Sequence, residues 1–491
     1  MTLSLDQWSR GNQSGVAYDM TVEGAWEQLA LDYASTGGNL PLSRVFEIAK
    51  SHGTKAIVKE SRYIDGGWRS QLARFYNGTF RRYPSVCHRL HFFTCQVPSD
   101  LADLSDLQDA YKGYAVLRPL PLSPVGRTMI APPPEMDGAV RNECTEQIDL
   151  FGWRFEITAM PFMSQDTQFL RCAHAALWMV LQHGHLRHGM PHRLPSEIHD
   201  AATGGVMVGR QLPSDGLSAF QLFSAMTALG LSPTRKPLRA TAAEDAQEVS
   251  LRLFGMICRY INSSLPPIVI STTHAWVMVG YKRSDNIGDP TIQLWRHDDA
   301  RGPYMPVGDP WNEPEEAHKP WLSVYLPLLP KAFLDAERAE LVGRTWVDFF
   351  ARTPSVYDKT TLRAANDRPA PHDQATYRTY LIRSNEFKEN LVDRGVPSEL
   401  AAAYRLMPMS KYIWVVEIVD RKLRQSGHAD VLGEVILDAT LTQFEPLQDP
   451  ASVMALHVDN FAFITGVDQA PSIRPSLPVG ITYETGCPVL N

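Results

Sequence analysis

The stretch QFLRCAHAALWMVLQHG, residues 168–184, decides how the sequence is interpreted, because it places a cysteine in front of a long apolar run. Residues 173–181 are apolar except for His174, which predicts a helix that is buried on most sides and ends at Gly184. Cys172 then lies in the first turn, where unpaired backbone N–H groups and the helix dipole favour a thiolate. Because free cysteines are more often small buried hydrophobes, the helix alone assigns no function.

The composition is that of a soluble globular protein with two to four domains. The chain has 491 residues, of which 44% are hydrophobic and 21% charged. Its net charge of -7 lacks the basic footprint of nucleic-acid binding, so we expect no nucleic-acid partner. The N-terminal sequence has no signal-peptide pattern, and no run approaches the about 18 apolar residues of a membrane span. The six cysteines show no paired spacing. We therefore expect a cytoplasmic protein without a membrane partner.

Two proline-bearing segments predict the domain boundaries. APPPEMDG at residues 131–138 and NEPEEAHKP at residues 312–320 read as extended connections. They divide the chain into a mixed α+β domain at 1–150, a middle domain at 151–319 and a small α+β domain at 320–491. The predicted fold class is α+β.

Both flanking regions contain strand-like patterns. Residues 111–130, YKGYAVLRPLPLSPVGRTMI, alternate apolar and β-favouring residues around prolines and predict edge strands with turns. KYIWVVEIVD at residues 411–420 and LGEVILDATL at residues 432–441 predict two further strands. These patterns assign no role to either region.

The middle region supplies a histidine and carboxylates in a suggestive order. Residues 264–282, SLPPIVISTTHAWVMVGYK, predict a short buried strand, a break, and a second strand opened by His274. Residues 291–304, TIQLWRHDDARGPY, predict a third strand that pairs with the second as an antiparallel hairpin. The start of one strand then lies beside the end of its partner, which places His274 next to Asp298 or Asp299. Cysteine, histidine and carboxylate are the nucleophile, base and orienting group of acyl transfer.

Residues 162–310 resemble the papain-like fold, and in particular the bacterial peptidases that cut bacteriocin leaders. Those proteins carry a glutamine and then a Cys-Gly that opens a helix rich in Ala, Leu and Met, and QDTQFLRCAHAALWMVL at residues 165–181 is similar. The segments SDGLSAFQLFSAMTALGLSP, PPIVIS and HAWVMVGY extend the resemblance. It implies a papain-like cysteine peptidase core of a helix plus an antiparallel sheet, with Cys172 as nucleophile and His274 as base.

Two positions depart from the family pattern. Ala173 stands where the family has glycine, which keeps a small residue beside the nucleophile. The glutamine of the oxyanion hole usually lies about six residues before the cysteine. Here Gln165 lies seven residues before Cys172 and Gln168 lies four before it. Gln165 requires the smaller loop adjustment and is preferred, while Gln168 stays open.

The third triad member has three candidates. Asp298 is preferred because it stands at the strand end nearest His274. Asp299 points to the opposite face if the strand continues, since successive side chains alternate. Asp309 precedes a proline, as the family's aspartate commonly does, but lies beyond the hairpin strand.

The expected function is that of a cytoplasmic thiol protease or amide hydrolase. It acts on a peptide or protein substrate through a Cys-His-Asp triad and an acyl-enzyme intermediate, without metal or organic cofactor. Two alternatives stay open: an acyltransferase of the transglutaminase kind, and a non-catalytic papain-fold binding or scaffold protein. The chain lacks the GxxxxGK loop that a leader-cutting transporter needs.

Two further clusters contain metal-ligand residue types. CHRLHFFTC at residues 87–95 matches no standard zinc spacing and is expected to pack in a core. HGHLRHGMPHRLPSEIH at residues 183–199 is rich in histidine and is expected to form a surface loop after the helix. We expect no metal site at either.

Overall fold

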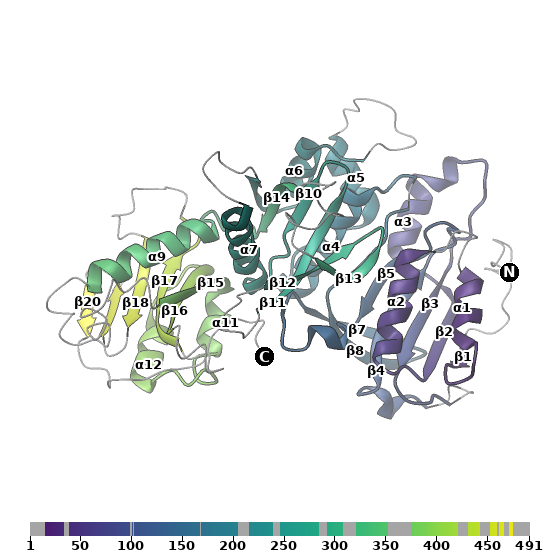
Figure 1. Ribbon diagram of the computed structural model, residues 1–491, viewed down its shortest axis with the longest axis horizontal. Coiled ribbons are helices and arrows are strands. Elements are labelled where there is room, and N and C mark those ends of the chain that lie inside the picture. Colours follow the sequence, from purple (N-terminus) through teal and green to yellow (C-terminus); the bar gives the residue numbers. More distant parts are fainter. Residues whose placement is uncertain are drawn as a thin grey trace. The chain divides into compact units, whose positions relative to one another are not determined.

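The chain forms an α+β structure with antiparallel sheets, divided into two compact units. The computed structural model describes residues 15–33, 39–98, 101, 103–166, 168–204, 216–238, 246–283, 292–307, 321–351, 375–420, 431–441, 452–458, 461–465 and 471–474. The first unit comprises residues 1–246, 266–282 and 293–327, and the second comprises the remainder. Each unit is described by itself (Figure 1). Asp309 lies outside the described residues.

A five-stranded antiparallel sheet forms the N-terminal part of the first unit. Its strands follow chain order: β1 (Gly15–Asp19), β2 (Ala56–Tyr63), β3 (Cys87–Phe93), β4 (Tyr111–Leu117) and β5 (Val125–Ile130). Its helices are α1 (Ala25–Tyr33), α2 (Leu40–Ser51) and α3 (Gly66–Arg74), with 3-10 turns at Tyr76–Gly78, Ser105–Leu107 and Pro134–Met136. The expectation of edge strands is wrong for β4, which lies between β3 and β5. Its prolines fall in the connection to β5, where they cost no sheet hydrogen bond.

A second sheet of the first unit carries the candidate site. The strand order is β13-β12-β11-β10-β14-β9, and β6 pairs with β11. The bounds are β6 (Val140–Arg141), β9 (Ser232–Pro237), β10 (Ile268–Ser271), β11 (Ala275–Arg283), β12 (Ile292–Asp298), β13 (Gly302–Val307) and β14 (Trp321–Leu328). The predicted strands at β10, β11 and β12 are confirmed, and β12 neighbours β11. The expectation of one strand over residues 291–304 is wrong, because a turn separates β12 from β13.

The helix α4 (Cys172–His188) begins at the cysteine, as predicted. It continues beyond Gly184, so the expected end there is wrong. Gly189 ends the helix with a left-handed φ of 65°. Gly184 makes room for a neighbour instead: a Cβ there would lie 2.8 Å from the Met190 sulfur.

The histidine-rich segment is mostly helical, so the expected surface loop is wrong. Its first half completes α4, and its second half begins α5 (Pro195–Thr203). His183 is fully buried inside α4. The remaining elements of this unit are α6 (Ala219–Ala228) and the hairpin of β7 (Cys144–Leu150) and β8 (Trp153–Ala159). The first seven residues of CHRLHFFTC form β3 and are all buried, so they pack in a core as expected.

The expected boundary near residue 150 falls inside the first unit, in the turn of the β7–β8 hairpin. The strand β6, which precedes it, pairs with β11 of the second sheet. A division into compact units does not establish which segments fold alone, so the three-domain scheme stays a prediction.

The second unit is built on a six-stranded antiparallel sheet in chain order. Its strands are β15 (Ala375–Arg383), β16 (Tyr412–Asp420), β17 (Val431–Asp438), β18 (Val453–Val458), β19 (Phe461–Thr465) and β20 (Pro471–Arg474). Its helices are α7 (Ala246–Asn262), α9 (Ala336–Ala351), α11 (Ser384–Glu389) and α12 (Ser398–Leu406). Alternate residues of β16 face opposite sides: Val415 joins the core under α11 and α12, while Val416 lies against Gly343 of α9. Helices therefore cover both faces.

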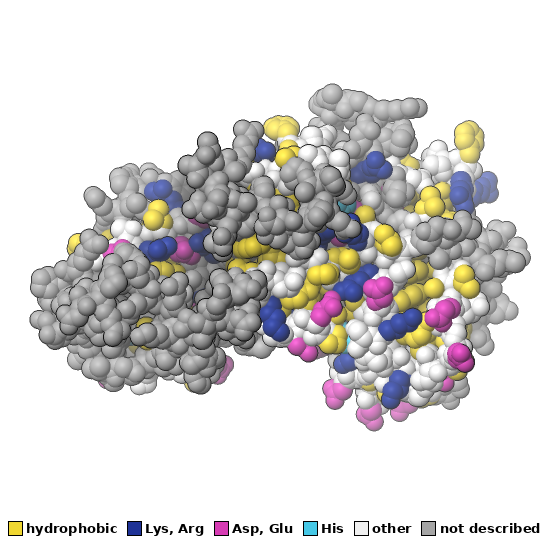
Figure 2. All heavy atoms as spheres, in the orientation of Figure 1, with side chains coloured by type: hydrophobic (Ala, Val, Ile, Leu, Met, Phe, Trp, Pro, Cys, Tyr) yellow, Lys and Arg dark blue, Asp and Glu magenta, His cyan; other side chains and the backbone are white. Residues whose placement is uncertain are grey.

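The described surface mixes charge types. Figure 2 shows basic and acidic side chains interspersed over the described part of the face in view. None of the described helices combines the length and the apolar character needed to cross a bilayer.

Candidate active site

Cys172 lies at the accessible end of an otherwise buried helix. The thiol is free and half-buried, whereas the next twelve residues of α4 are all buried. Arg171 precedes it in extended conformation, and its backbone N–H donates to Nδ1 of His174 at 3.4 Å. Burial, with a smaller effect of His199, lowers the pKa of His174 to about 3, so this ring is a neutral acceptor. Because the apolar run buries the body of the helix, Cys172 is left at its accessible end.

A tight turn leads the chain into Cys172. The Asp166 carboxylate is buried and accepts hydrogen bonds from the backbone N–H groups of Gln168 at 2.9 Å, Phe169 at 2.7 Å and Leu170 at 2.8 Å. Three bonds to one oxygen fix the path of this turn. Gln168 thus contributes its backbone to the turn.

His274 stands in the short connection between β10 and β11. Its backbone N–H donates to Ser271 Oγ at 3.1 Å, and its carbonyl accepts from the Ser271 N–H at 2.9 Å. The ring is 14% exposed, and Nε2 lies 2.9 Å from Oδ1 of Asp298. The Cys172 side chain lies close enough to this ring to raise its pKa. Because Nε2 holds the carboxylate, Nδ1 is the nitrogen left for the thiol.

Asp298 both shapes a turn and binds the imidazole. Its Oδ1 accepts from the backbone N–H groups of Ala300 at 3.0 Å and Arg301 at 3.2 Å, which turns the chain from β12 into β13. Its Oδ2 lies 3.5 Å from Nε of Arg296. The side chain is 2% exposed. These contacts together hold the Asp298 carboxylate in an orientation that faces His274.

Asp299 lies on the same side of the site as Asp298. Its Oδ1 is 3.5 Å from Nε2 of His274, and the side chain is 1% exposed. The strand does not continue past Asp298, so the alternation that would turn Asp299 away does not apply. Neither carboxylate oxygen has a hydrogen-bond partner of normal geometry, although the backbone N–H of Gln165 lies close enough to lower its pKa.

The three titratable groups shift one another strongly. Burial opposes the imidazolium, but the hydrogen bonds with Asp298 and Cys172 and the two carboxylate charges raise the pKa of His274 to about 10. Burial also acts to raise the pKa of Asp298, yet the hydrogen bond and charge of His274 leave it below its usual value. Burial and the charge of Asp298 raise the pKa of Asp299 to about 7. At neutral pH the site therefore holds an imidazolium against an ionised Asp298.

Arg296 is a site residue that the sequence patterns did not single out. Its guanidinium lies 4.6 Å from the ring centroid of Trp276, which in turn lies 5.8 Å from the His274 ring. Arg296 precedes Asp298 by two positions on β12, so both side chains share one face. The two-residue spacing of Arg296 and Asp298 was the signal in the sequence that could have identified Arg296 as a site residue.

The structure brings four of the sequence-derived candidates together. Cys172, His274, Asp298 and Asp299 form one contiguous group. The backbone of Gln165 lies beside Asp299. Among the described residues, His274, Asp298 and Asp299 are the one group whose ligand-type atoms all lie within 4.8 Å of one another. The short His274–Asp298 distance is that of a hydrogen bond from a protonated Nε2 to the carboxylate, so it does not require a bridging metal ion.

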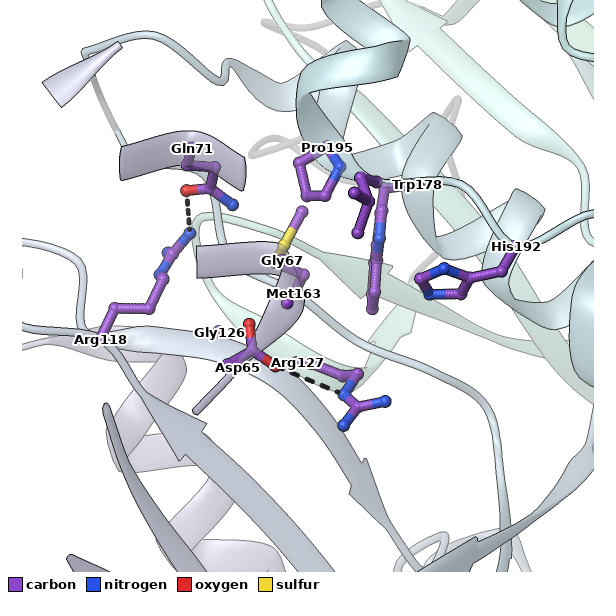
Figure 3. A pocket seen from close by; sticks show the side chains of 12 residues that line it. Asp65, Gly67, Gln71, Arg118, Gly126, Arg127, Met163, Trp178, His192 and Pro195 are labelled. Atoms are coloured by element: carbon purple, nitrogen blue, oxygen red, sulfur yellow. Dashed lines mark hydrogen bonds and ion pairs between the residues drawn. The ribbon is translucent and has the colours of Figure 1, made fainter. Parts of the chain in front are cut away.

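A separate pocket, lined by both charged and apolar side chains, lies beside Trp178 of α4. It contains about 450 Å³ of space, including the part open to solvent. Figure 3 shows Trp178 and Met163 beside the Asp65–Arg127 ion pair, whose atoms are 3.7 Å apart. Neither Cys172 nor His274 lines this pocket.

A scan against protein-family models found no match, and a search of curated proteins found none either.

Proposed function

We propose that this chain is a thiol protease or amide hydrolase with a papain-like catalytic core. The observation that supports the proposal is the continuous chain of contacts from Cys172 through His274 to Asp298. These are a nucleophile at a helix start, a base on the ring nitrogen that faces it, and a buried carboxylate that fixes the other nitrogen.

The mechanism begins from a thiolate–imidazolium pair. In the resting pair the Cys172 proton resides on Nδ1 of His274, and the Asp298 carboxylate stabilises the resulting imidazolium at Nε2. The sulfur then attacks the carbonyl carbon of an amide, and a C–S bond forms while the carbonyl oxygen becomes an oxyanion. His274 returns its proton to the leaving amine as the C–N bond breaks. Water attacks the thioester, gives a proton to His274 and releases the acid and the free thiol.

The oxyanion needs preorganised donors. The N–H groups at the start of α4 are the backbone donors nearest the nucleophile in sequence, and the helix dipole favours negative charge there. The Gln165 side-chain amide is the second donor in this proposal, and its backbone already lies beside Asp299 of the same site.

The proposal is tested with the full-length protein and an unstructured protein substrate such as casein. New peptides should appear with wild type and with Cys95→Ala, a matched control at another half-buried thiol. They should be absent with Cys172→Ala. Liquid chromatography with mass spectrometry measures the products.

The same experiment separates hydrolysis from acyl transfer. Addition of an amine such as glycine methyl ester should leave free acids as the main products if water is the natural acceptor. Amide adducts in their place would favour an acyltransferase. Equal cleavage by wild type and Cys172→Ala would refute the proposed nucleophile, and the loss of all acyl chemistry from wild type would favour a binding or scaffold protein.

A further inference from the structure

A buried arginine from the N-terminal sheet holds the segment that precedes the candidate nucleophile. Arg118 directly follows β4 and is 1% exposed. Its Nη2 lies 3.0 Å from the carbonyl oxygen of Ser164 and 3.4 Å from that of Gln165. The same atom contacts the carbonyls of Ser123 at 3.1 Å and Val125 at 2.9 Å. One guanidinium therefore ties the β4–β5 connection to residues 46 and 47 positions further along the chain.

A serine from the same connection strengthens this tie. Ser123 Oγ donates to the carbonyl oxygen of Gln165 and lies 3.0 Å from Ser164 Oγ. Ser164 Oγ donates in turn to the Val125 carbonyl at 2.6 Å, and its backbone N–H reaches the same oxygen at 3.3 Å. The 164–165 backbone is thus bound from several directions.

The partners of Arg118 are unusual for a buried cation. Among the described residues its contacts are carbonyl, hydroxyl and amide oxygens, including Gln71 Oε1 at 3.4 Å from Nη1 (Figure 3), with no carboxylate at ion-pair distance. Burial lowers the pKa of this guanidinium, which the charge of Asp166 partly offsets. A buried charge without an ion partner is costly. Nη2 reaches the backbone carbonyls while Nη1 reaches the Gln71 side chain, and the single nitrogen of a lysine lacks this two-pronged, planar arrangement.

The backbone of Gln165 is consequently held on both sides of its Cα. Its carbonyl accepts from Arg118 and Ser123, while its N–H lies beside the Asp299 carboxylate of the candidate site. Fixing the backbone of a residue fixes the direction in which its side chain leaves it.

We propose that Arg118 is a positioning residue that orients Gln165 as an oxyanion donor. This inference rests on the proposed function. It makes the region before residue 150 part of the active-site framework.

The test compares two reactions of the same thiol in the full-length protein. p-Nitrophenyl acetate acylates Cys172 through a tetrahedral oxyanion, as the C–S bond forms and p-nitrophenolate leaves. Iodoacetamide alkylates Cys172 by direct displacement of iodide, without an oxyanion. The ratio of the two rates reports oxyanion stabilisation alone, because thiol reactivity and access affect both.

Arg118→Lys should lower the acylation rate by about 10- to 100-fold, less than the about 10²- to 10³-fold loss expected when an oxyanion donor is removed outright. The alkylation rate should stay within about twofold of wild type. Arg127→Lys is the matched control, because Arg127 lines the same pocket but binds Glu146 and Asp65. It should change neither rate.

A double variant separates positioning from a merely structural role. If Arg118 acts through Gln165, then Arg118→Lys should add little to the acylation defect of Gln165→Ala, because the side chain it orients is already gone. Should Arg118→Lys fail to fold, Ser123→Ala removes the other donor to the same carbonyl. In Ser123→Ala, a drop of about threefold or more in the acylation rate without a drop in the alkylation rate would likewise support positioning of Gln165.

Each outcome decides the matter. Equal losses of acylation and alkylation, or additive effects with Gln165→Ala, would show that Arg118 only supports the fold. An unchanged acylation rate would overturn the inference while leaving the proposed function in place. If wild-type Cys172 is alkylated but never acylated, the proposed function fails and the inference fails with it.

Discussion

Each unit buries a pair of neighbouring carboxylates, but their surroundings differ. In the second unit Glu417 and Glu434 stand opposite each other on β16 and β17 and are fully buried. Arg394 Nη2 lies 3.4 Å from Glu417 and 2.8 Å from Glu434, and the Tyr380 hydroxyl donates to Glu417 at 3.1 Å. This pair has a cation between its members.

The pair in the first unit, Asp298 and Asp299, shares a histidine between its members, while Arg296 lies 3.5 Å from Asp298. His274 connects it to a half-buried thiol, and Asp299 is left without a hydrogen bond of normal geometry. A buried cluster whose charges are matched by arginine is a structural contact, whose disruption by loss of one partner strongly destabilises the fold. A cluster that leaves a raised pKa and a nucleophile beside it has the features of a reactive site. Both pairs are buried, so the side chains that contact the carboxylates, rather than their burial, distinguish the structural cluster from the candidate reactive site.

The largest effect is expected at the base. His274→Ala should reduce acylation of Cys172 by about 10⁴-fold or more, since the thiol loses its proton acceptor. Glu434→Gln, at a buried carboxylate of the other cluster, should leave the rate of the folded protein within about twofold. Stopped-flow measurement of p-nitrophenolate release checks both. A comparable loss of acylation rate in both variants would contradict the distinction between the reactive site and the structural cluster.

The orienting carboxylate should come next. Asp298→Asn should lower acylation by about 10²- to 10⁴-fold, because the amide no longer stabilises the imidazolium or selects its tautomer. Asp299→Asn should cost about tenfold or less, since its distance to Nε2 is longer. The same assay compares them. A larger loss at Asp299 would exchange the two roles.

Arg394→Ala tests the other cluster through stability. Removal of the shared cation deprives Glu434 of its arginine and leaves Glu417 only Arg378, 3.9 Å away, which should destabilise the second unit by about 3–5 kcal/mol. Hydrogen exchange of the β16 and β17 amides measures this loss locally. Exchange at wild-type rates would show that the charges there are not coupled.

The smallest effect concerns Asp299 and pH. Its folded pKa of about 7 lies above the usual 3.8, so the folded state gains stability from its proton at low pH and loses it as pH rises through 7. Asp299→Asn removes this titration. Relative to wild type, the variant should therefore become more stable between pH 4 and pH 8, by a few kcal/mol at most. Thermal unfolding across this range measures the trend, and a flat difference would contradict it.

Local patterns in the sequence predicted much of the site. The apolar run predicted that a helix begins at Cys172, and short apolar runs separated by a break predicted the strands on either side of His274. Strand adjacency then predicted the Asp298 contact, which the hydrogen bond at 2.9 Å confirms. These features arise from continuous apolar runs bounded by turn residues, which short stretches of sequence carry.

Other features could not be predicted, because no local sequence pattern encodes them. The turn after Asp298 depends on a carboxylate that binds two backbone N–H groups, and it brings Asp299 to the site. Gly184 and Gly189 differ only in the neighbours that pack against them and in φ. The contact of Arg118 with Ser164 joins residues 46 positions apart, and a single sequence contains no signal for such a pairing.

The most direct test of the central claim is the location of the acyl group. Full-length protein is mixed briefly with p-nitrophenyl acetate, quenched in acid to preserve thioesters, digested and mapped by mass spectrometry. The account predicts a thioester on Cys172, absent from the His274→Ala protein under the same conditions. An acetyl group on another cysteine, or the same yield on Cys172 without His274, would contradict it.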